Sequence, residues 1–337
     1  MRLLIPHCLR DAVWPLAASY HSHRALRKAP RFTLAQAFAS LEPMVASKVS
    51  QGSPRLRGIE PLASRDNRWL RRFRAALRGG EALDGCVGVE GPRLVEEALR
   101  SGLQVEAVLV SAAGERHFAD MEDRLDAGVR LLRASDRLFA GVADTETPQG
   151  IAALVRAHRA TFDEILGGAQ ASAALVVVLV GVQDPGNVGT ILRAAEAFGA
   201  TGAATCAAGS IGSANPLAPK ALRSSAGAAL RLPVVQGVGA AVLLAQLRIA
   251  GVKLYAASVL ASQAGGARPV LNPWQADLHG PAALLIGNEG AGLPGEVERS
   301  ADALVRIPLA AGVDSLNAAS AAAVLLYEAA RQRGLRQ

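Results

Sequence analysis

The sequence predicts an α/β protein whose larger, C-terminal part is built on a parallel β-sheet. Short apolar segments typical of strands alternate with amphipathic segments typical of helices along most of the chain after residue 66. Residues 174–182, ALVVVLVGV, form a β-branched apolar run, as expected for a strand that is covered on both faces. Such parallel sheets bind ligands at the carboxyl ends of their strands, so we look for a site there.

A length of 337 residues fits two domains, and the pattern divides the chain into three parts. Residues 1–60 have a mixed composition with many turn formers, which predicts a poorly ordered leader. The alternation of strands and helices then predicts a small α/β domain over residues 61–160. After a connector, the larger domain is predicted over residues 171–335.

The small domain begins with a helix over residues 67–78, in which apolar side chains recur at helical spacing and arginines occupy the other face. A second helix, over residues 92–102, has proline in its first turn and glycine at its end. The remaining elements expected here are a helix over residues 117–128 and strands over residues 86–91, 105–111 and 147–157.

The larger domain continues the alternation from its first strand, residues 174–182, to a long last helix. Further strands are expected over residues 200–206, 231–235, 253–258, 282–287 and 303–309. Helices are expected over residues 188–199, 215–230, 239–251 and 315–334.

Cysteine usage and the first residues of the chain both indicate the cytoplasm. Cys8, Cys86 and Cys206 lie far apart and form no CxxC pair, which favours free thiols in a reducing compartment. Charge inside the first apolar segment argues against a secretory signal, and the longest apolar run is half of the roughly twenty residues that a membrane span needs. No cluster of His, Cys and carboxylates has ligand spacing, so we expect no metal.

The net charge of +7 is concentrated in the front of the chain. Residues 1–80 hold fifteen Lys or Arg against four Asp or Glu, whereas residues 161–337 hold twelve against eleven. A basic front half next to a neutral back half predicts that one part binds a polyanion while the other does chemistry. The candidate contacts with RNA phosphates are Arg65, Arg68, Arg71, Arg72 and Arg74, although a solvated helix face explains these arginines equally well.

Three glycine-containing polar turns follow three predicted strands, at residues 183–187, 287–290 and 311–317. Glycine lets a backbone approach a ligand closely, and each turn lies where an open α/β sheet binds ligands. If the turns converge, one pocket receives Asn187, Arg193, Glu289, Ser315 and Asn317. Taken singly, Asn187 and Ser315 are also explained as helix caps, and Arg193 as a solvated residue on a helix face.

Several common enzyme motifs are absent from these turns. The first turn, GVQDPGNVG, lacks the spacing of GxGxxG, and the chain contains no GxxxxGK[ST], HExxH or GxSxG. Dinucleotide-dependent redox enzymes, P-loop ATPases, zinc hydrolases and serine hydrolases therefore lose support.

Three segments resemble, in order, the three motifs of the SpoU (TrmH-like) RNA 2′-O-ribose methyltransferases of the SPOUT class. They are VGVQDPGNVGTILRAAEAFGA, LLIGNEGAGL and VRIPLAAGVDSLNAASAAAVLLYEA, which together span residues 180–329. The segment with VGVEGPRLVEEAL and TPQGIAALV resembles the small ribosomal-protein-like RNA-binding domain that often precedes the catalytic domain. The resemblance implies a parallel-sheet methyltransferase domain with a C-terminal trefoil knot, which patterning alone would not suggest.

The resemblance also implies S-adenosylmethionine as cofactor and a role for each candidate residue. Arg193 would favour the alkoxide form of the ribose 2′-hydroxyl and bind the adjacent phosphate, and Asn187 would hold this arginine or the ribose. Glu289 would orient Arg193 or a group of a partner chain, while Ser315 and Asn317 would hydrogen-bond substrate and cofactor. The cofactor pocket would be formed by the backbone around Ala257, Ser258, Gly287, Ile307 and Leu316.

The predicted function is S-adenosylmethionine-dependent methylation of a ribose 2′-hydroxyl in structured RNA. We favour rRNA over tRNA, because an extra RNA-binding domain is commoner on the rRNA-directed relatives. The alternative is a catalytically idle RNA-binding or ribosome-assembly module that retains the fold.

A homodimer through the C-terminal domain is also predicted, because the last helix is apolar nearly all round and must be buried on more than one side. The helix after Asn187 or the first domain could equally cover it, and the dimeric habit of the resembling family favours a second copy. A charge at Ala322 or Leu326 should then reduce both association and activity. The small-residue surface of this helix comprises Ala318, Ala319, Ala322, Ala323, Leu326, Ala329 and Ala330.

Overall fold

The computed structural model describes residues 58–79, 85–168, 174–207, 209, 212–258 and 268–334. The chain divides into two units, residues 1–54 and residues 55–337. The predicted leader lies outside the described residues up to position 57. The second unit contains both β-sheets.

The small domain has a five-stranded mixed sheet in the order β1-β4-β3-β5-β2. β5 runs antiparallel to β2 and β3, whereas β4 runs parallel to β3 and β1. The strands are β1 Glu60–Leu62, β2 Cys86–Glu90, β3 Val105–Val110, β4 Arg130–Ala134 and β5 Ile151–Arg156.

Alternate side chains of this sheet pack against helices on its two faces. One cluster joins the sheet to α3 Arg68–Gly79 and α6 Asp136–Ala140. The opposite cluster joins it to α4 Pro92–Arg100 and α5 Glu115–Ala119. The predicted helix over residues 117–128 is wrong in length, because the segment breaks into α5 and the 3₁₀ turn η2 Glu122–Arg124, beside the 3₁₀ turn η1 Ala112–Gly114. Only Phe118 and Met121 are buried there, so little packing opposes the poor helix propensity of its aspartates and glycine.

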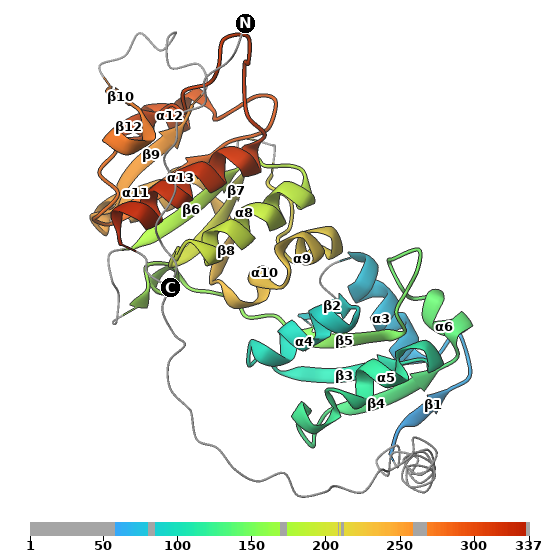
Figure 1. Ribbon diagram of the computed structural model, residues 1–337. Coiled ribbons are helices and arrows are strands. Elements are labelled where there is room, and N and C mark those ends of the chain that lie inside the picture. The colour runs from blue at the N-terminus through green and yellow to red at the C-terminus, as the bar shows by residue number, and fades with distance from the viewer. Residues whose placement is uncertain are drawn as a thin grey trace, which may run out of the picture. The chain divides into compact units, whose positions relative to one another are not determined.

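The large domain has a seven-stranded parallel sheet in the order β10-β12-β9-β11-β6-β7-β8 (Figure 1). The predicted α/β class with a parallel sheet is therefore confirmed. The knot stays a prediction. The strands are β6 Leu175–Val180, β7 Gly202–Ala207, β8 Val234–Gly239, β9 Lys253–Ala257, β10 Val270–Leu271, β11 Ala282–Ile286 and β12 Ala303–Val305.

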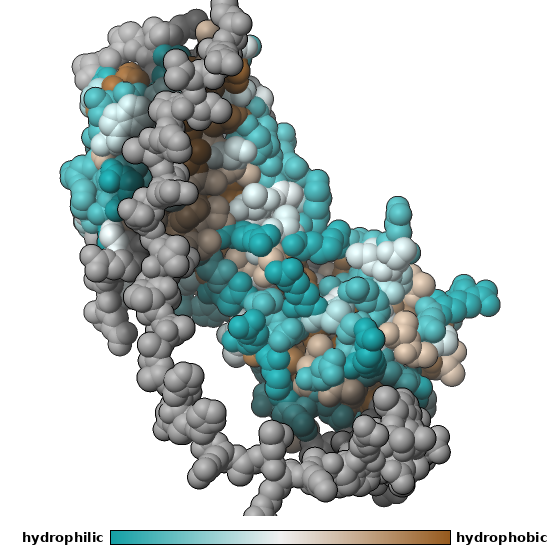
Figure 2. All heavy atoms as spheres, in the orientation of Figure 1, coloured by the Kyte–Doolittle hydropathy of each residue, from teal (hydrophilic) through white to brown (hydrophobic). Residues whose placement is uncertain are grey.

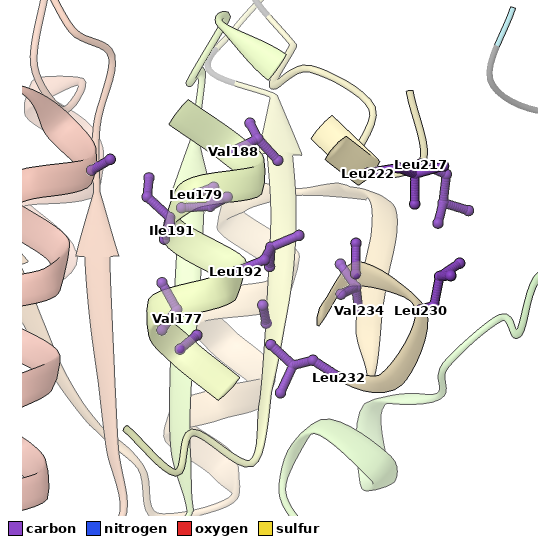
Figure 3. Close-up of a cluster of buried hydrophobic side chains, with 14 of the residues drawn as sticks. Val177, Leu179, Val188, Ile191, Leu192, Leu217, Leu222, Leu230, Leu232 and Val234 are labelled. Carbon is purple, nitrogen blue, oxygen red and sulfur yellow. The ribbon is translucent and has the colours of Figure 1, made fainter. Parts of the chain in front are cut away.

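Helices cover both faces of the large sheet, which explains why β6 is apolar at every position. Val177 and Leu179 of β6 face α8, and Figure 3 shows them beside Val188, Ile191 and Leu192 of that helix. The neighbouring residues of β6 belong to the cluster on the other face. The first face carries α8 Pro185–Ala197, α9 Pro219–Ser225, α10 Ala228–Arg231 and α13 Ala318–Gln332, and the second carries α7 Phe162–Ile165, α11 Ala240–Ile249 and α12 Gly295–Ser300.

The structure departs from the predicted elements of the large domain in one divided helix and in three short elements. The helix predicted over residues 215–230 is divided into α9 and α10, because Ala226 and Gly227 adopt left-handed conformations with φ of 49° and 83°. The strand β10, the 3₁₀ turn η4 Pro273–Gln275 and the helix α12 were not predicted.

The longest described helix, α13, has 15 residues. In the part of the chain that the structure describes, no helix has both the length and the apolar character needed to cross a bilayer.

Candidate functional site

The carboxyl ends of four neighbouring strands meet at one edge of the large sheet. β12, β9, β11 and β6 lie side by side and all run in the same direction, so the loops that follow them leave the sheet together. These loops include the three polar turns predicted from the sequence. The prediction that the turns converge can therefore be followed atom by atom.

Asn187 joins the three turns through the two ends of its side-chain amide. Its Nδ2 donates to Glu289 Oε1 over 2.8 Å, and its Oδ1 accepts from Asn317 Nδ2 over 3.1 Å. The backbone N–H groups of Gln183 and Asp184 also point at the Glu289 carboxylate, at 3.5 and 3.4 Å. Three of the five predicted catalytic residues thus form one hydrogen-bonded group.

The turn after β11 is shaped by Asn288, which sequence reasoning missed. Asn288 Nδ2 donates to the carbonyl of Gly181 at the end of β6 over 2.9 Å. Its Oδ1 accepts from the N–H groups of Gly290 and Ala291, both at 2.9 Å, and so closes the turn. At Gly287, a Cβ would lie 2.4 Å from the carbonyl carbon of Gly292, so only glycine fits. This turn fixes the direction in which Glu289 projects.

The cap of α8 is Asp184 rather than Asn187. Asp184 Oδ1 accepts from the N–H of Gly186 over 3.0 Å, and Pro185 occupies the first helical turn. Lys220 Nζ lies 2.6 Å from the same carboxylate, and this hydrogen bond, followed by that of Gly186, lowers the pKa of Asp184. Because Asp184 caps α8, the Asn187 side chain is available to bind Glu289 and Asn317. The sequence analysis did not include Asp184 and Lys220 in the predicted site. An aspartate directly before a proline is a known signal for a helix cap and could have identified Asp184.

Asn317 both caps α13 and contacts the site. Its Oδ1 accepts from the N–H groups of Ala319 and Ser320, at 2.8 and 3.3 Å, while its Nδ2 donates to Asn187. Ser315, which could have been the cap, is exposed two residues earlier. The last helix is therefore connected to the first turn of the site through a single amide.

Glu289 is held as a carboxylate anion. Burial raises its pKa, but hydrogen bonds from Asn187 and from the backbone, including the N–H groups of Asp184 and Gln183, outweigh that effect, so the pKa lies below its ordinary value. An anion that accepts several hydrogen bonds orders its donors, and it is a poor proton acceptor near neutral pH. In the structure it accepts hydrogen bonds from Asn187 and from the backbone of the first turn.

Arg193 lies outside the hydrogen-bonded group. It is exposed on α8, six residues after Asn187, which places it about 9 Å further along the helix axis and on a different side of the helix. Within the described ranges Arg193 makes no hydrogen bond or ion pair, and Glu289 contacts Asn187 instead. The structure thus brings together Asn187, Glu289 and Asn317, and leaves the Arg193 guanidinium facing solvent.

Four of the five residues predicted to bind the cofactor lie at the ends of the same strands, and the fifth, Leu316, lies in the loop directly before α13. Ala257 ends β9, Gly287 follows β11 and Ile307 follows β12. Ala257 and Ile307 are half-buried, and Leu316 is 37% exposed. Ser258 differs, because its Oγ donates to Glu298 Oε1 of α12 over 2.9 Å and the residue is buried. Apolar side chains together with backbone groups suit a neutral adenosyl group, so these residues are chemically able to hold S-adenosylmethionine.

The five arginines predicted to bind RNA divide into two sets. Arg65, Arg68 and Arg71 are exposed. Arg72 pairs with Glu106 over 2.6 Å and stacks on Trp69, and Arg74 donates to the carbonyl of Gly141 over 3.2 Å. The first three therefore remain the better candidates for phosphate contacts.

Comparison with known proteins gives matches for both domains. The family described as the SpoU rRNA Methylase family matches residues 174–327. The family described as the MRM3-like substrate binding domain matches residues 83–153.

Curated relatives match over most of their length. An uncharacterized tRNA/rRNA methyltransferase of Synechocystis is 35% identical over 258 residues, which cover 75% of this chain and 87% of the relative. The 23S rRNA (guanosine(2553)-2′-O)-methyltransferase RlmP of Bacillus subtilis is 34% identical over 240 residues, which cover 71% of this chain and 86% of the relative.

Solved structures give the same result. The SpoU methyltransferase AviRb of Streptomyces viridochromogenes, solved with AdoMet, has a TM-score of 0.68 and 28% identity, covering 80% of this chain and 100% of that one. An AdoMet-bound rRNA methyltransferase of Sinorhizobium meliloti has a TM-score of 0.67 and 27% identity, covering 83% of this chain and 100% of that one.

Proposed function

Because the chain belongs to the SpoU rRNA methylase family, we propose that the joined turns after β6, β11 and β12 are the active site of an RNA 2′-O-ribose methyltransferase. The two family matches also confirm the resemblance that was found in the sequence. The observation that carries the assignment of the site is the contact of Asn187 with Glu289 and Asn317, which unites one residue from each of the three sequence motifs.

S-adenosylmethionine, when bound, supplies a methyl group on a positively charged sulfur. Ala257, Gly287, Ile307 and Leu316 would hold it through apolar contacts and backbone groups at the strand ends. The chain contributes chiefly position, since a ribose hydroxyl and a methyl donor held in line react far faster than free reactants. Glu289, Asn187 and Asn317 fix the three turns relative to one another and so fix that geometry.

Arg193 supplies positive charge where the ribose oxygen loses its proton. A guanidinium beside the 2′-hydroxyl stabilises the oxyanion, and it can also bind the neighbouring phosphate with two parallel hydrogen bonds. Its exposure leaves it accessible to RNA arriving from solvent. Ser315, which is exposed in the loop before α13, would hydrogen-bond the same nucleotide.

A homodimer through the large domain remains part of this proposal. In the single chain, α8 packs beside α13, and Ala322 and Leu326 are 0% exposed. A charge at either position would therefore disrupt the core, and it would not test association alone. The exposed apolar residues of α13 are Val324 at 41% and Tyr327 at 58%, and Tyr327 meets the ring of Phe198 edge to face at 5.9 Å. Figure 2 looks onto this face, where hydrophobic surface is visible among polar residues.

The favoured substrate is rRNA. The RlmP relative is named for a 23S rRNA nucleotide, and residues 83–153 match a substrate-binding domain. The exposed residues Arg65, Arg68 and Arg71 would contact its phosphates. The buried thiol of Cys206, which forms no disulfide, supports action in a reducing cytoplasm.

The test is to incubate the full chain with labelled S-adenosylmethionine and either total rRNA or total tRNA, and to map any methylated ribose. Transfer to rRNA in the presence of a chelator is the expected result. A chain that binds cofactor and RNA but transfers no methyl would instead identify an idle RNA-binding module. Transfer only to tRNA would overturn the choice of substrate, and loss of transfer with the chelator would overturn the expected absence of a metal.

A further inference from the structure

Arg231 of α10 binds carboxylates of two different elements. Its Nε and one terminal nitrogen donate to both oxygens of Glu196 on α8, over 2.6 and 2.8 Å. Its other terminal nitrogen forms an ion pair with Glu97 of α4, a helix of the small domain. One guanidinium therefore connects the small domain to the helix that carries Asn187 and Arg193.

These three side chains are less exposed than most of the ion pairs in the described residues. Arg231 is 28% exposed, Glu97 19% and Glu196 32%. Bidentate geometry and partial burial distinguish such a group from a mobile surface pair. Gly227, at φ 83°, adds close backbone packing, because a Cβ there would lie 2.8 Å from the Cβ of Glu97.

The contact between Arg231 and Glu196 is relevant to function because Glu196 lies on α8 close to Arg193. Glu196 lies three residues after Arg193, so the two side chains are neighbours on the helix surface. The other end of α8 is held through α9, where Lys220 pairs with Asp184 at 2.6 Å and Arg223 pairs with Asp144 of the small domain at 2.8 Å. Contacts with the small domain therefore reach both ends of α8.

We propose that Arg231 is a positioning residue for methyl transfer, because it binds Glu97 and Glu196 together and so sets α8 and Arg193 relative to RNA held by the small domain. This inference rests on the proposed function. An ion pair that merely stabilises the fold would change the free energy of unfolding, and it would leave the turnover of folded protein unchanged.

The first test separates turnover from binding. Glu97→Gln removes the negative charge from the small-domain side of the contact and leaves Arg231 bound to Glu196. We expect kcat for RNA methylation to fall about tenfold, with Kd for S-adenosylmethionine and for rRNA unchanged within error. Arg231→Lys should give a similar fall, since an ammonium cannot hold two carboxylates with the geometry of a guanidinium.

Arg100→Ala is the matched control. Arg100 is the other partner of Glu97, at 3.3 Å on the same helix, and its side chain is 62% exposed. Its removal alters the charge around Glu97 without touching α8, so wild-type kcat is expected. An equal fall in kcat for Arg100→Ala and Glu97→Gln would overturn the proposal.

Hydrogen exchange of the α8 backbone amides in the full chain without RNA gives a second readout. Glu97→Gln should speed exchange in α8 about tenfold, although the substituted residue lies in the other domain, and Arg100→Ala should not. Unchanged exchange in α8 would refute the coupling. If the wild-type protein transfers no methyl to any RNA, the proposed function fails, while the exchange experiment still decides the role of Arg231.

Discussion

At the scale of single residues, the site depends on the side-chain amide of Asn187, which donates to Glu289 and accepts from Asn317. Only asparagine and glutamine carry an amide that donates at one end and accepts at the other, and glutamine is longer by one methylene. Aspartate would place a second carboxylate beside Glu289 and would have no hydrogen to donate. The Asn187 amide therefore connects the turn after β11, which carries Glu289, to the loop before α13, which carries Asn317.

Glu289 should contribute stability in a defined range of pH. Its pKa in the folded chain is lowered, because hydrogen bonds from Asn187 and the backbone outweigh burial. A group of this kind stabilises the fold above its unfolded pKa of about 4.3, and the contribution is lost as pH falls through the lower folded value. Urea unfolding of wild type and Glu289→Gln should differ by a constant amount from pH 6 to 8, a range chosen to lie about two units above that pKa. The difference should shrink below about pH 4. A difference that grew on acidification would show that the sign is wrong.

Arg193 should affect chemistry and leave cofactor binding intact. Arg193→Ala removes a charge that stabilises the developing oxyanion, so kcat should fall about a hundredfold to a thousandfold. Arg193→Lys should recover little, because lysine lacks the planar fork that binds a phosphate with two hydrogen bonds. Single-turnover rates and calorimetry with S-adenosylmethionine would measure the two effects separately. Near-normal turnover by Arg193→Ala would remove this residue from the mechanism.

At the scale of elements, α8 and α9 pack so closely at Gly189 that there is no room for a side chain between them. A Cβ at Gly189 would lie 2.0 Å from Ser224 Oγ and 2.2 Å from the carbonyl oxygen of Ala221. Gly189→Ala should therefore push the helices apart and lower the free energy of unfolding by about 1–3 kcal/mol, with a fall in activity because Asn187 shares this part of α8. Gly280→Ala is the control, since a Cβ there meets nothing within 4 Å. Equal stability of the two variants would contradict the close packing.

The strands of both domains were largely predictable, because apolar periodicity reports burial directly. The break between α9 and α10 was not, since Ala226 is a strong helix former and its left-handed conformation accompanies close packing of Gly227 on Glu97. Sequence reasoning offered Asn187 as the cap of α8, whereas the cap is Asp184. Asp184 stands directly before a proline, which is the pattern of a helix start.

The candidate site was predictable only in part, for a related reason. Resemblance selected residues from three turns, and three of those residues prove to be in contact. Periodicity carries no information on which partner a side chain takes across the fold. The ion pair of Arg72 with Glu106 and the isolation of Arg193 from Glu289 therefore became apparent only from the coordinates.

At the scale of the whole molecule, association through α13 should be sensitive to its exposed face. Tyr327→Asp places a charge on a side chain that is 58% exposed, so it should divide the dimer and reduce methylation without unfolding the chain. Ile249→Asp on α11, where the side chain is 88% exposed, is the control and should change neither. Sedimentation should give twice the chain mass for wild type and the control. A wild-type monomer that is fully active at micromolar concentration would end the dimer proposal.

Binding of RNA to the small domain should depend on salt. Replacing Arg65, Arg68 and Arg71 with glutamine should reduce the slope of log Kd against log salt by about two to three, since each phosphate contact contributes roughly 0.7 to 0.9. Affinity for S-adenosylmethionine should not change. Replacing Arg248 and Arg299 of α11 and α12 is the control for a loss of positive charge outside the small domain. An unaltered slope in the triple variant would show that these arginines are only a solvated helix face.

The long sequence separation within the site has a consequence for how the protein is made. Gln183 and Glu289 are 106 positions apart, and Asn187 and Asn317 are 130 apart. As the chain leaves the ribosome, β6 can pair early with β7. The other edge of β6 can pair only after β11 has been synthesised. Such distant pairing is slow to form, so the small domain has time to fold and dock before the catalytic turns exist. We therefore expect translation that stops before Asn317 to yield a chain that binds RNA through its small domain and cannot modify it.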